Sequence, residues 1–248
     1  MSSRQADDHA LAAQIAHAAG SLLLDLRANG ATKEDGDRES NELILRLLRQ
    51  ARPDDAVLSE ESKDDLVRLQ RERVWIVDPL DGTREFGEPG RTDWAVHVAL
   101  VLGGTPHACA VALPAQDELV LSTALPPSLP PPHDGPLRLL VSRTRPPQLA
   151  AYLAEQLDAE LVPMGSAGAK TMAVVQGQAD VYAHGGGQYE WDSAAPVGVA
   201  AAAGCHTSRL DGSSLRYNCA NPYLPDLLVC RPELAATVLA RIAAAADR

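Results

Sequence analysis

One stretch, residues 74–86, joins an apolar segment directly to two carboxylates and strongly limits how this chain can fold. Residues 74–77 favour a buried β-strand, and Asp78, Pro79 and Asp81 follow at once. Residues three apart point to opposite faces of a continuous strand, so a turn at Pro79 is needed to bring the aspartates together. Two adjacent carboxylates repel each other unless a cation or a shared proton separates them, and Mg²⁺ prefers such oxygen ligands.

The charge balance bounds the kind of ligand. The chain has 22 Lys and Arg against 33 Asp and Glu, a net charge of −11, which argues against binding nucleic acid through its phosphates. Any phosphorylated ligand would need cations between itself and the chain.

The four cysteines lack CxxC spacing, which fits a reducing cytoplasm. No apolar run approaches the roughly 20 residues of a membrane helix, and no targeting signal is readable.

Residues 1–125 predict an α+β half. Two amphipathic helices come first, one capped by Asp7 or Asp8 and closed by Gly30, the other following the polar segment 32–41 and ending near Pro53. A charged segment at 63–71 predicts a further helix. Apolar runs predict strands at 56–59, 74–77, 94–102, 107–113 and 119–124. Two helices before mostly antiparallel strands are typical of α+β proteins.

Residues 126–136 contain six prolines, too many for a helix or a central strand, and we expect a connection there. Residues 137–248 then alternate between the two kinds of element, which predicts an α/β half with a parallel or mixed sheet. The expected strands are 137–142, 160–164, 179–183 and 227–230, and the expected helices are 147–157, 169–176, 192–203 and 232–246.

Two further acidic positions are candidates for the same site. Glu60 and Glu61 follow the short strand at 56–59, where a solvated loop is the simpler interpretation. Asp192 is expected to cap the alanine-rich helix that ends before Gly204, and a carboxylate at a helix N-terminus can serve a site as well. The spacing of Asp78 and Asp81 favours metal-activated water over a covalent aspartyl-phosphate.

Three segments together carry a family resemblance. Residues 75–83, residues 191–195 with the closing Gly204, and Glu60 with its neighbours resemble the signature motifs of the inositol monophosphatase superfamily. The resemblance implies a layered αβαβα sandwich of the inositol monophosphatase and fructose-1,6-bisphosphatase type, with the site between the two halves. It also implies lithium-sensitive phosphomonoester hydrolysis that depends on two or three Mg²⁺ ions. Whether two copies form a homodimer is left open.

The resemblance also implies roles for individual residues. The implied metal ligands are Glu60, Asp78, Asp81, Asp192 and the carbonyl of Leu80. Thr83, hydrogen-bonded to Asp37, would activate a water together with Glu60, and the N–H groups of Gly82 and Thr83 would contact the phosphate. We expect Asp81→Asn to abolish most activity and, without metal, to raise the unfolding temperature slightly, because it removes one of several repelling charges.

Arg84 and Glu85, before Phe86, resemble the 3′(2′),5′-bisphosphate nucleotidase branch, which includes the bacterial CysQ group. The implied reaction removes the 3′-phosphate of 3′-phosphoadenosine 5′-phosphate to leave AMP. The implied nucleotide-binding residues are Ser142, Arg143, Arg145, Gly165, Ser166 and Lys170, whose cations would neutralise the second phosphate. The alternatives are a phosphatase for inositol-1-phosphate or fructose-1,6-bisphosphate, and a catalytically silent protein that binds metal and nucleotide.

Overall fold

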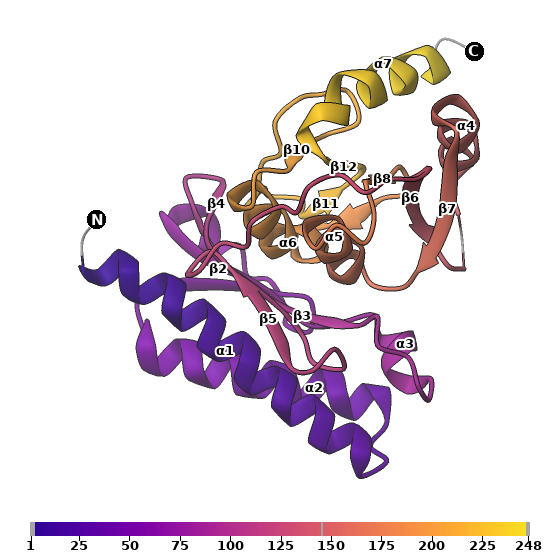
Figure 1. The fold of residues 1–248 in the computed structure, drawn as a ribbon. Helices are drawn as coiled ribbons and strands as arrows, with labels where there is room; N and C mark the ends of the chain where they lie inside the picture. Colours follow the sequence, from indigo (N-terminus) through magenta and orange to yellow (C-terminus); the bar gives the residue numbers. More distant parts are fainter. Residues whose placement is uncertain (1–2, 145, 247–248) are drawn as a thin grey trace.

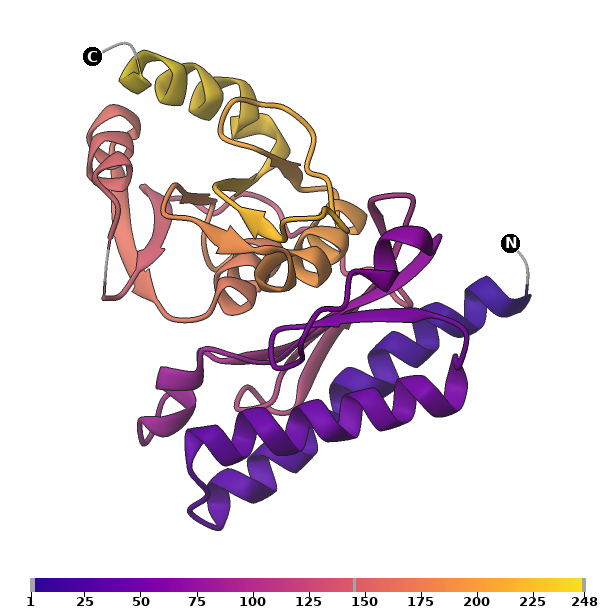
Figure 2. The ribbon, with the colours of Figure 1, turned by 180° about the vertical axis from the view of Figure 1, so that it is seen from behind.

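The computed structural model describes residues 3–144 and 146–246 of the chain, and the elements in them form five layers (Figure 1). A helix pair covers one face of a five-stranded sheet, and a second helix pair lies between that sheet and another one. A third pair covers the outer face of the second sheet, as Figure 2 shows from behind. This is the αβαβα order that the family resemblance implies.

The first layer contains α1 (Ser3–Ala28) and α2 (Lys33–Ala51). The core-facing residues of α1 recur at helical spacing and are Ala12, Ile15, Ala16, Ala19 and Leu23. Gly30, with a φ of +75°, ends this helix as predicted. The proposed cap at Asp8 is wrong because the helix begins earlier, and Asp8 is buried against Arg52, 2.7 Å away. The side chain of Asp7 lies outside the described residues.

The start of α2 also differs from the prediction. The polar segment 32–41 is not a connection, because all of it after Thr32 is helical. Thr32 and Asp35 form a capping box, in which each side chain hydrogen-bonds the backbone N–H of the other residue. Local capping therefore outweighs the lack of apolar residues, and it places Asp37 on a helix.

The first sheet has the order β1-β2-β3-β4-β5, with β1 parallel to β2 and every other pair antiparallel. Its strands are β1 (Ala56–Ser59), β2 (Arg73–Asp81), β3 (Ala95–Leu102), β4 (Thr105–Leu113) and β5 (Leu119–Ser122). A short helix, α3 (Thr83–Gly87), follows β2. The helix predicted at 63–71 is wrong, since only a 3₁₀ turn forms, at Val67–Gln70. The buried Arg68 side chain holds this segment by binding Asp64 and Asn218.

The second sheet is mixed and has the order β10-β12-β8-β6-β7. β6 is parallel to β7 and β8, while β12 is antiparallel to β8 and β10. Its strands are β6 (Leu137–Ser142), β7 (Ala159–Met164), β8 (Val181–His184), β10 (His206–Ser208) and β12 (Leu227–Cys230). The pair β9 (Gln188–Tyr189) and β11 (Tyr223–Leu224) is separate. The sequence did not predict β9, β10 or β11, because two or three residues show no periodicity.

The helices of the C-terminal half are α4 (Gln148–Leu157), α5 (Ala167–Val175), α6 (Glu190–Ala202) and α7 (Ala235–Ala246), the last preceded by a 3₁₀ turn at Pro232–Leu234. α5 and α6 lie between the sheets, and α4 and α7 cover the outer face. Gly198 lets α6 approach the first sheet, because a Cβ there would collide with Cys109. The division into residues 1–125 and 137–248 stays a prediction. Among the described helices, none has the length and apolar character needed to cross a membrane.

Candidate active site

An irregularity within β2 brings Asp78 and Asp81 together. Asp78 pairs with His97 of β3 and Asp81 pairs with Ala95, so three steps along β2 match two along β3. Such a bulge adds one residue, and both carboxylates therefore point to the same side of the sheet. The predicted convergence is correct, but the strand does not stop in a turn. Pro79 fits this position because it has no N–H to contribute to the ladder.

Asp192 of α6 joins this pair from the other half of the chain. Ligand oxygens of Asp78, Asp81 and Asp192 lie within 4.8 Å of one another. Asp192 does not cap α6 as predicted, because the helix begins at Glu190 and Tyr189 holds the cap position. Its carboxylate accepts the N–H of Tyr189 at 2.6 Å instead, which orients it toward the two aspartates of β2.

Glu60 completes this acidic cluster of Glu60, Asp78, Asp81 and Asp192. Its side chain hydrogen-bonds Asp78 although the residue is exposed, and desolvation and then the charge of Asp192 raise its pKa to about 7. Burial and then Asp81 raise the pKa of Asp192 to about 6, and burial and Glu60 hold that of Asp78 well above its usual value. A cation would relieve this repulsion. The oxygen donors, with no sulfur among them, fit a hard divalent metal.

Asp81 differs from the other three acids of the cluster, because the donors around it are sufficient to keep its carboxylate ionised. Its carboxylate accepts the Ser166 hydroxyl at 2.5 Å and the Gly168 N–H at 2.7 Å, and His97 Nε2 lies 3.3 Å away. Burial alone would raise the pKa of Asp81, but His97 and the two donors of the α5 segment together lower it. Asp81 thus remains ionised and also fixes the N-terminus of α5.

His97 is a site residue that the sequence analysis missed. It is fully buried, and its Nδ1 donates to the carbonyl of Trp191 at 3.0 Å, next to Asp192. Gly168 leaves room for the ring, since a Cβ there would collide with Nε2. Burial opposes its charged form, but Asp81 raises the pKa of His97 overall. The sequence signal that could have identified His97 was the presence of a histidine within the apolar run 94–102.

Asp37 and Thr83 lie together beside the cluster, as the resemblance implies. Burial and the charges of Glu61 and Glu34 raise the pKa of Asp37 to about 7, while a hydrogen bond with Thr83 partly offsets this shift. The Thr83 hydroxyl has a single hydrogen, which it can donate to Asp37 or to the carbonyl of Leu80, 3.1 Å away. A group that titrates near neutral pH next to a hydroxyl can accept and return a proton under physiological conditions.

A cavity of about 260 Å³ opens at the start of α3, between the two halves of the chain. Its lining residues are Gly82, Thr83, Arg84, Glu85, Ser142, Arg143, Thr144, Met164, Gly165, Ser166 and Lys170. It therefore collects every substrate-binding residue that the sequence predicts, except Arg145, which lies outside the described residues.

Several of these predicted groups already have partners within the protein. The N–H of Gly165 donates to Asp93 at 2.6 Å, and the hydroxyl of Ser166 is bound to Asp81. Lys170 is buried, and its amine donates to the carbonyls of Ser166 and Gly165 at 2.7 and 3.2 Å. Burial lowers the pKa of Lys170. Asp93 was not predicted, although an acid directly before the strand that contains His97 was a usable signal.

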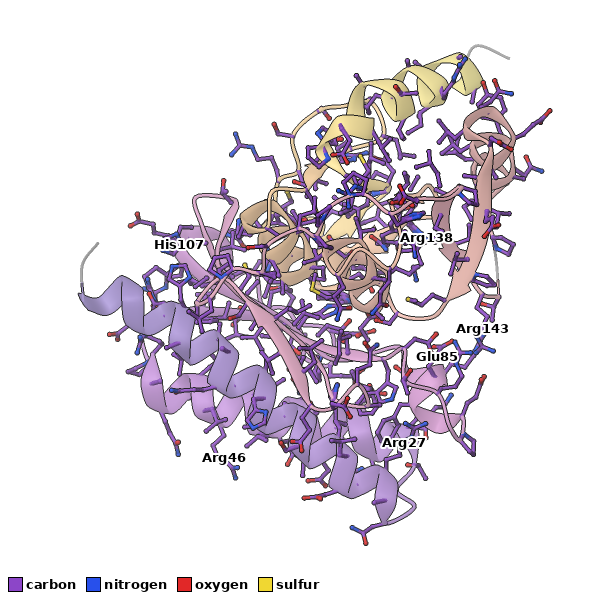
Figure 3. All side chains as sticks on the ribbon, viewed as in Figure 1. Arg27, Arg46, Glu85, His107, Arg138 and Arg143 are labelled. Carbon is purple, nitrogen blue, oxygen red and sulfur yellow. The ribbon has the colours of Figure 1, made fainter. Side chains whose placement is uncertain are left out.

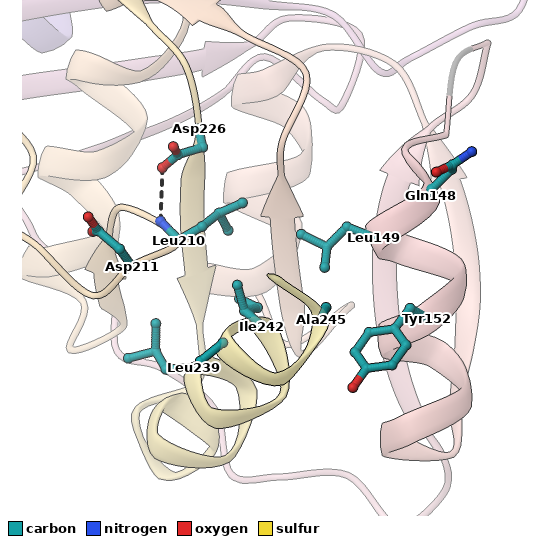
Figure 4. A pocket seen from close by; sticks show the side chains of 10 residues that line it. Gln148, Leu149, Tyr152, Leu210, Asp211, Asp226, Leu239, Ile242 and Ala245 are labelled. Atoms are coloured by element: carbon teal, nitrogen blue, oxygen red, sulfur yellow. Dashed lines mark hydrogen bonds between the residues drawn. The ribbon is translucent and has the colours of Figure 1, made fainter. Parts of the chain in front are cut away.

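A larger cavity of about 720 Å³ lies far from these acids, between α4 and α7 (Figure 4). Leu149, Leu239 and Ile242 make its lining mostly apolar. Its best-placed carboxylate, Asp226, accepts the N–H of Leu210 at 2.8 Å. By size alone, this cavity would be chosen as the active site. Of the two cavities, however, only the smaller one adjoins groups capable of phosphate chemistry.

This fold and this arrangement of acids define a family. The sequence model of the inositol monophosphatase family matches residues 10–128 and 135–247, and the chain belongs to that family. The chain is 54% identical over 242 residues to the 3′-phosphoadenosine 5′-phosphate phosphatase of Mycobacterium tuberculosis (strain CDC 1551 / Oshkosh), covering 91% of this chain and 89% of that protein. It is 32% identical over 203 residues to the 3′(2′),5′-bisphosphate nucleotidase CysQ of Escherichia coli (strain K12), covering 77% and 81%.

A solved structure agrees with the fold. The crystal structure of CysQ from Bacteroides thetaiotaomicron superimposes with a TM-score of 0.80 at 25% identity, over 91% of this chain and 97% of that one. The predicted fold class and family are therefore confirmed.

Proposed function

We propose that this chain is a Mg²⁺-dependent phosphatase that hydrolyses 3′-phosphoadenosine 5′-phosphate to AMP and orthophosphate. The observation that supports this most directly is the position of the acidic cluster beside a small cavity that contains Arg84, Arg143 and Lys170. Carboxylates that bind metal and cations that bind phosphate are the two requirements for hydrolysis of a phosphomonoester by an acidic protein. The names of the mycobacterial and CysQ relatives support the choice of nucleotide.

Within this proposal, Asp78, Asp81 and Asp192 would hold the metal, together with Glu60 and the Leu80 carbonyl, which the family resemblance adds. Bound Mg²⁺ lowers the pKa of a water molecule and neutralises charge on the phosphoryl oxygens. The protein's own contribution is to position the acids by three means. The β2 bulge aligns Asp78 with Asp81, the N-terminal turn of α6 orients Asp192, and α5 anchors Asp81.

Proton transfer is assigned to Asp37 and Thr83. With a pKa of about 7, Asp37 can take the proton that Thr83 relays from the attacking water. The water oxygen forms a bond to phosphorus as the bond between phosphorus and the 3′-oxygen breaks. The released 3′-alkoxide takes a proton from a neighbouring water molecule, and Asp37 returns its own proton to solvent. Gly82 and Thr83, at the first turn of α3, line the cavity where the transferred phosphate would bind.

A panel of substrates tests the proposal. Orthophosphate release is measured for 3′-phosphoadenosine 5′-phosphate, inositol-1-phosphate and fructose-1,6-bisphosphate with Mg²⁺, and again with added Li⁺. We expect the nucleotide to have the highest kcat/KM and Li⁺ to inhibit. A higher kcat/KM for either of the other substrates would make the nucleotide assignment wrong.

The catalytically silent alternative has its own signature. Calorimetry that shows tight nucleotide binding, with no orthophosphate released over hours, would favour it. The retention of Asp37, Thr83 and all four acids of the cluster supports catalysis, because binding alone does not need a proton acceptor beside a hydroxyl.

We also propose a cytoplasmic location. Cys109, Cys205, Cys219 and Cys230 are all free thiols, as is usual in a reducing compartment. The homodimer stays a prediction from the family resemblance.

A further inference from the structure

Of the three cations that line the small cavity among the described residues, two are committed to partners within the protein. The Arg143 guanidinium contacts Glu85 Oε1 at 2.8 and 3.2 Å (Figure 3). It also contacts Glu88 Oε1 at 2.8 Å. Two glutamates around one arginine leave this group with a formal charge of −1. The Lys170 amine is occupied by backbone carbonyls. The carboxylates cancel the charge of Arg143, and the carbonyls occupy the N–H donors of Lys170, so neither group is free to bind a second phosphate directly.

Arg84 is different. It lines the same cavity, is exposed, and lies in the first turn of α3. Across residues 3–144 and 146–246, its guanidinium makes no ion pair or hydrogen bond. We propose that Arg84 binds the phosphate that is not hydrolysed, and so determines selectivity for bisphosphorylated nucleotides. This inference rests on the proposed function and adds a residue that the family motifs did not assign to substrate.

The neighbouring Glu85 anchors the short helix that carries Arg84. Glu85 is buried, and its carboxylate joins α3 to the second half of the chain through Arg143. The fit is close, because a Cβ on Gly165 would collide with the Glu85 carboxyl group. Consecutive helical residues point in different directions, so Glu85 anchors α3 while the preceding Arg84 presents its charge to the cavity.

The guanidinium of Arg84 and a phosphate group are chemically complementary. A guanidinium binds phosphate oxygens through two parallel N–H donors, which gives both strength and orientation. A ligand with two phosphates entering a chain of net charge −11 gains most from a cation that has no carboxylate of its own. A ligand with a single phosphate, which is bound at the acidic cluster through metal, gains little from Arg84.

The test compares two nucleotides that differ by one phosphate, 3′-phosphoadenosine 5′-phosphate and adenosine 3′-monophosphate, both with Mg²⁺. We expect Arg84→Gln to lower kcat/KM for the bisphosphate roughly 10- to 100-fold, mainly through KM, and to change that for the monophosphate by less than about threefold. Arg84→Lys should recover part of the loss, since it keeps the charge without the planar donor pair.

Two further variants serve as controls. Arg46→Gln removes the same charge from the exposed surface of α2, far from the cavity, and should leave both substrates unaffected (Figure 3). Arg143→Gln should lower the unfolding temperature and affect both nucleotides alike, because it leaves Glu85 buried without its partner.

Equal losses for the two nucleotides in Arg84→Gln, or no loss, would overturn this inference alone. A loss confined to the bisphosphate in Arg143→Gln would transfer the role to that residue and also overturn it. If the wild-type protein releases orthophosphate from neither nucleotide, the proposed function fails and this inference fails with it.

Discussion

Asp78 and Asp81 are three residues apart, but their surroundings favour opposite charge states. Burial and Glu60 raise the pKa of Asp78, whose carboxylate accepts the N–H of Leu80. Asp81 accepts hydrogen bonds from Ser166 and Gly168 and has His97 Nε2 3.3 Å away, and its pKa is lowered despite burial. Asp78 is therefore the acid that most needs a cation, whereas Asp81 also serves as a structural anchor.

We predict that Asp78→Asn lowers activity at least about 100-fold, because it removes ligand charge from the metal site. In EDTA at pH 8 the same variant should unfold at a higher temperature than the wild type. The neutral amide no longer repels Glu60 and Asp81 inside the protein. Thermal unfolding followed by circular dichroism, with and without Mg²⁺, measures both states.

For Asp81→Asn the structure reverses the expectation of a small stabilisation. Activity should still be lost, but the amide oxygen is a weaker acceptor for Ser166 and Gly168, and the charge beside His97 is removed. We expect a loss of about 1.5–3 kcal/mol of stability, or roughly 3–10 °C in unfolding temperature. If Asp81→Asn instead raised this temperature in EDTA, as is expected for Asp78→Asn, the anchoring role of Asp81 would be wrong.

The junction of β2 and α3 depends on the backbone of Gly82. This residue has a φ of +89° at the cap position of α3. An added Cβ would lie 3.1 Å from the carbonyl oxygen of Asp93 and 3.2 Å from Trp94 Cα. We predict that Gly82→Ala costs about 2–4 kcal/mol, from the left-handed backbone together with the crowding. Urea unfolding measures this loss, and activity should fall with it, because the turn positions Thr83.

Gly30→Ala is the matched control. Gly30 has a similar φ of +75°, but a Cβ there has no atom within 4 Å, so only the backbone cost of about 1–2 kcal/mol applies. Gly30→Ala should therefore destabilise the protein less than Gly82→Ala and leave activity unchanged. Equal destabilisation by both alanines would mean that crowding at Gly82 is unimportant.

At the scale of the whole molecule, the site should make stability depend on pH and metal. In the folded protein the pKa values of Asp37 and Glu60 are about 7, and that of Asp192 is about 6, all above the ordinary range. A carboxyl group with a raised pKa stabilises the fold while protonated, and this contribution disappears as the pH rises through the folded pKa. Metal-free protein should therefore unfold at a lower temperature at pH 8 than at pH 6.

Stabilisation by Mg²⁺ should depend on pH in the opposite direction to the stability of the metal-free protein. It binds the ionised carboxylates, so it should raise the unfolding temperature more at pH 8 than at pH 6, where protons compete. Calorimetric scans at the two pH values with EDTA or saturating Mg²⁺ give the four temperatures needed. Equal stabilisation by Mg²⁺ at both values would contradict the proton competition on which this prediction depends.

Much of the architecture could be predicted because it depends on local patterns. Apolar runs marked β1, β6 and β12 with their observed bounds, and Gly30 ended α1. The predictions were wrong where a contact distant in sequence decided the outcome. In the segment near 63–71, where a helix was predicted, Arg68 hydrogen-bonds Asn218, 150 residues away.

The sequence by itself determined the chemistry of this protein: which acids are available, that two of them follow a buried strand, and which family motifs they match. Tertiary structure decided how each charge is used. Asp81 is ionised because α5 supplies donors to it, His97 reaches Asp81 through strand pairing, and Arg143 is neutralised by Glu85 while Arg84 has no such partner. The physical reason is that desolvation and hydrogen bonding depend on neighbours brought from distant parts of the chain, and local patterns carry no information about them.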